Sequence, residues 1–150
     1  MDDGNQQIEQ QMTVLLRRVQ RIHILTSSGE MDLDRSAYGI LCRLADQGPQ
    51  RLGSLATADP STITRQVQAL EKAGLAARSA DSADRRASIL NLTGEGRTVL
   101  DRTRDHRRQR LEVILCDWTD EDRARLGELL AKFNASMDAL VDADRSGDNG

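Results

Sequence analysis

One short helix with clear start and stop signals, followed by a predicted hairpin, most constrains the fold of this chain. Asp59 is a favourable N-cap, and Pro60 suits the first helical position because its missing N–H needs no partner there. Gly74 stands just past the end, where helices favour a left-handed residue. The sequence therefore predicts a single short helix from Pro60 to just before Gly74.

The predicted helix has one apolar and one polar face. Ile63, Val67 and Leu70 recur at helical spacing and are expected to face inward. This turns a compact polar face outward, made of Ser61, Thr62, Arg65 and Gln68. An arginine on such a face can reach a guanine edge with two hydrogen bonds, whereas the plainer alternative is an ion pair between Arg65 and Glu71.

The segments on either side of this helix complete a recognisable pattern. Beyond Gly74, an extended segment, a polar loop that ends in Asp84-Arg85-Arg86 and a second extended segment over residues 87–92 predict a two-stranded hairpin with a charged tip. Before it, a brief helix over residues 51–56 and a tight turn at Thr57-Ala58-Asp59 give the helix-turn-helix pattern. A helix for one groove and a basic tip for the next suit DNA recognition.

Amphipathic helices are predicted toward both ends of the chain. A helix over about residues 5–26 has a narrow apolar stripe of Ile8, Met12, Leu15, Val19 and Ile22. Another begins at about Asp34, stops at Gly48-Pro49 and buries Ala37, Ile40, Leu41 and Leu44. Thr93 is expected to cap a long polar helix, and Thr119 a last helix that buries Leu126, Leu129, Leu130, Phe133, Met137 and Leu140. In the basic run over residues 102–110, interleaved acids favour pairs within the helix.

Composition makes a partner chain an early expectation. The 150 residues fit one globular unit, but a single Trp, Tyr and Phe leave the core to aliphatic side chains on helices that need covering. No apolar run approaches the roughly 20 residues that span a bilayer, and the acidic, polar start is unlike a signal peptide. We therefore expect a cytoplasmic protein without a membrane partner.

Charge is unevenly distributed along the chain. The net charge of −3 is low for a nucleic-acid binder, but residues 34–97 contain nine basic and seven acidic residues, a net +2. Because this surplus is modest, phosphates would have to meet a few well-placed arginines and backbone amides, and affinity should depend on a dimer.

Neither metal binding nor catalysis is suggested by the sequence. Cys42 and Cys116 stand far apart without a second ligand, as do His23 and His106, so no metal site and no disulfide framework is expected. No nucleophile motif or glycine-rich phosphate loop appears. We expect no enzyme activity and no cofactor, and buried reduced thiols rather than a redox switch.

The order and spacing of these segments resemble the MarR family of bacterial winged helix-turn-helix regulators. The resemblance spans nearly the whole chain and is densest in DPSTITRQVQALEKAGL followed by Arg78, the DRR of residues 84–86 and the LTGEGR of residues 92–97. Trp118 and Thr119, followed by an acidic helix start, are similar to members with long C-terminal dimerisation helices.

The resemblance implies a homodimer and a role for each residue of the predicted site. The first and last two helices of each subunit would interlock and present two recognition helices to the half-sites of a palindrome. By position, Ser61, Thr62 and Arg65 match residues at the major groove, with Thr64 and Gln68 flanking them.

In the wing, the same resemblance places Arg86 in the minor groove, oriented through a salt bridge from Asp84, while Arg85 meets phosphate. It also implies a small aromatic or phenolic effector, bound where the dimerisation helices meet the DNA-binding lobe, at residues that the sequence leaves unknown.

The expected fold class is mostly α (α+β): a winged helix-turn-helix lobe with a two-stranded wing, plus N- and C-terminal helices that form a dimerisation domain. The expected division is residues 1–33 (N-terminal dimerisation helix), 34–97 (DNA-binding lobe), 98–141 (C-terminal dimerisation helices) and 142–150 (disordered tail). The expected function is that of a homodimeric repressor, released from its palindromic operator by the effector. Two alternatives stay open: a thiol-based redox regulator using Cys42 or Cys116, and a protein-interaction module that does not bind DNA.

Overall fold

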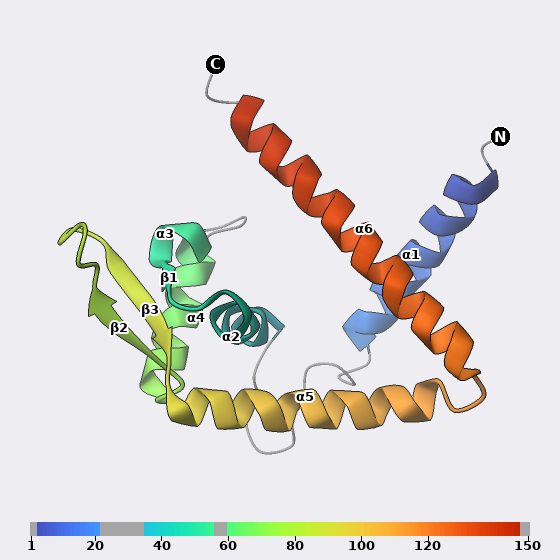
Figure 1. Cartoon of the computed structure of the whole chain (residues 1–150), viewed down its shortest axis with the longest axis horizontal. Helices are drawn as coiled ribbons and strands as arrows, with labels where there is room; N and C mark the ends of the chain where they lie inside the picture. The colour runs from blue at the N-terminus through green and yellow to red at the C-terminus, as the bar shows by residue number, and fades with distance from the viewer. Residues whose placement is uncertain (1–2, 22–34, 56–59, 148–150) are drawn as a thin grey trace. The chain divides into compact units, whose positions relative to one another are not determined.

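The computed structural model describes residues 3–21, 35–55 and 60–147 (Figure 1). Its helices and strands follow the order α1 (Asp3–Arg21), α2 (Arg35–Gln47), β1 (Gln50–Arg51), α3 (Leu52–Leu55), α4 (Pro60–Lys72), β2 (Ala76–Ala80), β3 (Ser88–Leu92), α5 (Gly94–Ile114) and α6 (Asp120–Gly147). The chain divides into two compact units, Met1–Arg110 and Leu111–Gly150. The fold is the mostly helical winged helix that the sequence predicts.

The sheet has one strand more than the predicted hairpin. β2 and β3 pair antiparallel from Ala76↔Leu92 to Ala80↔Ser88, and β1 pairs with the other edge of β3, so that the strand order is β1-β3-β2. Gly48, with φ at 78°, turns the chain between α2 and β1. The predicted two-stranded hairpin is confirmed, whereas β1 was not predicted because a two-residue strand carries no alternating pattern.

An aliphatic core holds α2, α3, α4, the sheet and the start of α5 together. Its buried side chains are Ala37, Ile40, Leu41, Leu44, Leu55, Val67, Leu70, Leu75, Ala76, Leu90 and Leu100. The predicted inward faces of α2 and α4 are thereby confirmed, with Ile63 partly buried against this core. Cys42, expected to be buried, is half-buried against the same cluster.

Both ends of α4 fit the signals in the sequence. The helix begins at Pro60, as predicted. Gly74 has φ at 75°, and the N–H of Leu75 donates to the carbonyl oxygen of Leu70 at 3.0 Å, which closes the last turn. Asp59, the predicted N-cap, lies outside the described residues with the rest of the predicted turn.

Thr93 joins the end of α4 to the start of α5. Its hydroxyl accepts a hydrogen bond from the N–H of Gly96 at 2.9 Å and donates one to the carbonyl oxygen of Gly74 at 2.7 Å. The predicted cap is confirmed. It also fixes where the hairpin leaves α4, because β2 starts two residues after Gly74.

The basic run of α5 only partly forms the expected pairs within the helix. Arg108 pairs with Asp105 at 3.0 Å as expected. Arg104, however, pairs with Asp46 of α2 at 3.0 Å, and the guanidinium of Arg107 lies 3.8 Å from the centre of the Tyr38 ring. These two arginines therefore fasten α5 to α2 within the first unit.

In the second unit, α6 leaves most of its apolar side chains in solvent, and only Leu126 of the residues predicted to be buried there is partly buried. The N–H of Asp122 donates to the Thr119 hydroxyl at 3.1 Å, which confirms the predicted cap. No side chain of α6 is buried within the described chain. The expectation that Leu129, Leu130, Phe133, Met137 and Leu140 are buried therefore fails for the single chain.

The last helix also runs further than expected. The sequence predicts a disordered tail from Asp142, but α6 continues to Gly147, and the Ser146 hydroxyl donates to the carbonyl oxygen of Asp142 at 2.9 Å. Polar composition suggested the tail, but no proline or glycine lies between Asp142 and Gly147 to end the helix earlier. Among the described helices, none combines the length and apolar character needed to cross a bilayer.

Replacing Gly96 should test the tight junction at the start of α5. A Cβ there would lie 2.9 Å from Leu92 Cδ1 and closer still to the backbone of Leu75, whereas one at Gly94 would meet nothing within 4 Å. We expect Gly96→Ala to lower the free energy of unfolding by about 2 to 3 kcal/mol. Gly94→Ala, in the same helical turn, should leave it unchanged or slightly higher. Urea denaturation measures both, and equal midpoints would contradict the close approach.

Candidate nucleic-acid interface

The polar face of α4 lies outward in the structure. α4 packs against α2 and β2, and Val67 and Leu70 point into the core. On the other side Ser61, Thr64, Arg65 and Gln68 are exposed, and Thr62 is partly buried. The five helix residues predicted for DNA contact are thus brought together on one element, and four of them are open to solvent.

Glu71 pairs with a residue other than the one that sequence reasoning considered. Its Oε1 lies 2.6 Å from Nε of Arg78, which ties the last turn of α4 to β2. The alternative in which Arg65 is held by Glu71 is therefore not the arrangement in the structure. Arg65 is exposed on the outer face of α4.

The wing tip, residues 81–87, is built from two successive side-chain-to-backbone turns. Asp81 Oδ1 accepts the N–H of Ala83 at 2.9 Å, and Asp84 Oδ1 accepts the N–H of Arg86 at 3.0 Å. The N–H of Asp81 donates to the carbonyl oxygen of Ala87 at 3.1 Å and closes the base of the tip. The residues between Asp81 and Ala87 are exposed, Arg85 among them.

The role expected of Asp84 changes in this geometry. The family resemblance implied a salt bridge from Asp84 to Arg86, but the carboxylate instead bonds the backbone N–H of Arg86. Asp84 thus fixes the backbone that carries Arg86 and leaves that side chain exposed. An aspartate side chain commonly accepts the backbone N–H of the residue two positions later and forms this turn.

A second acidic residue of the tip was missed by sequence reasoning. Asp81 is buried, and its Oδ2 lies 2.7 Å from Nη2 of Arg51 in β1. Only the presence of β1 beside β3 could have suggested this pair, and that strand was not predicted. The hydrogen bond from Ala83, together with Arg51, holds the pKa of Asp81 below its usual value even though burial acts in the opposite direction.

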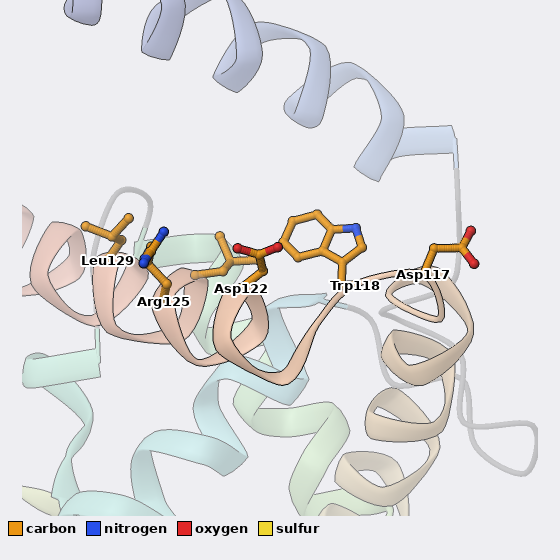
Figure 2. Close-up of a pocket in the computed structure, with 6 residues that line it drawn as sticks. Asp117, Trp118, Asp122, Arg125 and Leu129 are labelled. Carbon is orange, nitrogen blue, oxygen red and sulfur yellow. The ribbon is translucent and has the colours of Figure 1, made fainter.

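The second unit contains an open hollow with a mixed lining (Figure 2). Trp118, Leu126 and Leu129 supply its apolar part, and Asp117, Asp122 and Arg125 its charged part. Arg125 also pairs with Glu121 at 2.9 Å. Nearby Cys116 is exposed, and no cluster of metal-ligating side chains occurs among the described residues.

The fold and the exposed faces of α4 and the wing define a DNA-binding protein of the winged helix-turn-helix class. The model of the MarR family matches residues 33–88. The HTH-type transcriptional regulator YxaD of Bacillus subtilis is 34% identical over 134 residues, which cover 87% of this chain and 92% of the relative. The chain belongs to the MarR family of transcriptional regulators.

Two solved structures of regulators, one regulated by a small molecule and one solved with its ligand, share the fold. BpsR of Bordetella bronchiseptica, whose DNA binding is regulated by 6-hydroxynicotinic acid, is 27% identical with a TM-score of 0.63, covering 83% of this chain and 98% of its own. The transcriptional regulator PcaV of Streptomyces coelicolor, solved with its natural ligand, is 26% identical with a TM-score of 0.62, covering 82% and 91%.

The lowered pKa of Asp81 makes its stabilising effect dependent on pH. A carboxyl with a depressed folded-state pKa stabilises above its unfolded pKa of about 3.9 and loses the effect as pH falls through the folded value. We expect Asp81→Asn to lower the melting temperature at neutral pH, and the difference from the wild type to shrink below about pH 4. Thermal unfolding followed by circular dichroism across pH measures it, and a constant difference would argue against the ionised pair.

Proposed function

We propose that the protein is a homodimeric repressor that binds a palindromic operator and leaves it when a small molecule binds. The observation that carries this proposal is the exposed polar face of α4 with Arg65, on the same compact unit as an arginine-tipped wing. Membership of the MarR family supports the same reading.

In this proposal the recognition helix reads bases. Ser61, Thr62 and Arg65 face the major groove, with Thr64 and Gln68 beside them. A guanidinium that bonds the O6 and N7 atoms of guanine discriminates by about 1 to 3 kcal/mol. Burial of Val67 and Leu70 fixes the rotation of α4 about its axis, which keeps this face outward.

The wing contributes contacts to the neighbouring groove. Arg86 enters the minor groove and Arg85 meets phosphate, while Asp84 holds the backbone of Arg86 through the bond at 3.0 Å. A narrow minor groove has a strongly negative potential that attracts arginine, so this contact supplies affinity and depends on DNA shape.

Substitution of the two arginines tests these roles. Selection of bound sequences from a random duplex pool should yield a palindrome for the wild type, and Arg65→Ala should relax the preference at one position of each half-site. Arg86→Ala should weaken binding to all sequences and reduce the slope of log affinity against log salt by about one per arginine that is lost. Affinity and preference unchanged in both variants would refute the assignment.

The apolar side chains that a single chain leaves exposed support the dimer. Along α1 these are Ile8, Met12, Leu15 and Leu16, and along α6 they include Leu129, Leu130, Phe133, Met137, Leu140 and Val141. Exposed apolar patches of this extent mark protein interfaces. We assign residues 1–33 and 98–141, with the further turns of α6, to dimerisation, and residues 34–97 to the DNA-binding lobe. Val19 and Ile22, which belong to the predicted apolar stripe of the first helix, lie outside the described side chains.

Charges placed on the apolar face of α6 should separate the subunits. We expect the double variant Leu129→Asp, Phe133→Asp to sediment as a monomer and to lose operator affinity at least tenfold, because each carboxylate would be buried without a partner. The control variant Ala131→Asp, Ala135→Asp adds two carboxylates at the same spacing on the opposite, exposed face and should remain dimeric. A monomeric wild type at micromolar concentration in analytical ultracentrifugation would overturn the dimer.

The proposed effector is a small aromatic or phenolic molecule. The support comes from relatives: BpsR responds to 6-hydroxynicotinic acid and PcaV binds its natural ligand. Such a ligand releases DNA only through different affinities for the DNA-bound and free conformations. The thiol-based alternative stays a hypothesis, with Cys116 exposed and Cys42 half-buried.

A further inference from the structure

We propose that Asp81 is a positioning residue for DNA binding: its ion pair with Arg51 holds the wing tip in place relative to the helix-turn-helix. The proposal rests on the DNA-binding function proposed above and extends it to two residues outside the predicted site. In this proposal neither Asp81 nor Arg51 contacts DNA.

The pair crosses the sheet from one outer strand to the other. Arg51 lies in β1 opposite Ile89 of β3, whereas Asp81 directly follows β2 on the other side of β3. The distance of 2.7 Å between Nη2 of Arg51 and Oδ2 of Asp81 therefore joins elements separated by a full strand. Because β1 continues directly into α3, the pair links the tip through β1 to the first helix of the helix-turn-helix.

Asp81 is built into the tip more firmly than its neighbours. Its side chain is 8% exposed, whereas residues 82–86 are all exposed. One carboxylate oxygen takes Arg51, the other takes the N–H of Ala83, and the backbone N–H closes the base of the loop on Ala87. A single residue thus organises the loop that presents Arg85 and Arg86.

A second ion pair fastens the same hairpin to the recognition helix. Glu71 of α4 and Arg78 of β2 lie 2.6 Å apart. The hairpin is therefore held to α4 within β2, and to β1 and α3 at its tip. With the Arg51 pair lost, the tip would keep its local turns and its continuity with β2 and β3, and lose its link to β1.

The sign of the charge separates positioning from simple electrostatics. Asp81 is a negative charge in the same tip as Arg85 and Arg86, which would approach the polyanionic DNA, so its removal should strengthen binding if charge alone mattered. Positioning predicts the opposite, because a mobile tip reduces the fraction of molecules competent to bind.

Asp81→Asn and Arg51→Gln test the proposal in the full-length protein on the selected palindrome. Asparagine can still accept the N–H of Ala83, so the local turn is kept. We expect each single variant to bind about fivefold more weakly, with the salt slope unchanged because no phosphate contact is lost. The control is Asp46→Asn, which removes one carboxylate and one ion pair, with Arg104, from the same compact unit and should bind as the wild type does.

The double variant separates positioning from direct contact. If the pair acts only as a link, Asp81→Asn combined with Arg51→Gln should bind no more weakly than either single variant. A salt slope reduced in Arg51→Gln by about one per arginine that is lost, retained in the Asp81→Asn background, would show Arg51 on a phosphate and overturn the proposal. Tighter or unchanged binding by Asp81→Asn would also overturn it.

Hydrogen exchange gives a readout without DNA. In both single variants the amides of residues 82–87 should exchange faster while those of α2 and α4 stay protected. Should Asp81→Asn fail to fold, Arg51→Gln carries the test, since the Arg51 side chain is 57% exposed. A wild type that binds no duplex would sink the proposed function itself, whereas a response to Arg65→Ala and Arg86→Ala without one to Asp81→Asn or Arg51→Gln sinks only the positioning role.

Discussion

The junction between α4, the hairpin and α5 is the constraint on which the first unit depends. The Thr93 hydroxyl bonds Gly74 at the end of one helix and the N–H of Gly96 in the first turn of another. Gly96 approaches the Leu75 backbone so closely that no side chain fits between them. The exit of the wing, the end of the recognition helix and the start of the long helix are thus set at one point. A substitution that displaced this junction would therefore shift both α4 and the wing, the two elements proposed to contact DNA.

Local signals in the sequence predicted most of this architecture. Pro60 and Gly74 bounded α4, Thr93 and Thr119 identified two caps, and the spacing of Val67 and Leu70 gave the buried face. These predictions were correct because each of these features depends only on a few residues that are neighbours in the sequence.

What the sequence did not predict depends on residues that are distant in the chain. β1 has two residues and exists only because β3 lies beside it. The link from Arg51 to Asp81 follows from that strand, and the turning of Arg104 and Arg107 toward α2 follows from the packing of α5. The predicted DNA contacts of Ser61, Thr62, Thr64, Arg65, Gln68, Asp84, Arg85 and Arg86 stay predictions, with seven of these eight side chains exposed.

The aliphatic character of the core has a practical consequence for spectroscopy. The only tryptophan in the sequence, Trp118, belongs to the second unit, where it is 44% exposed and lines the open hollow. Indole emission therefore originates from a single position in the sequence, between α5 and α6. The emission wavelength and the quenching of Trp118 would therefore report binding or conformational change at this hollow without an introduced label.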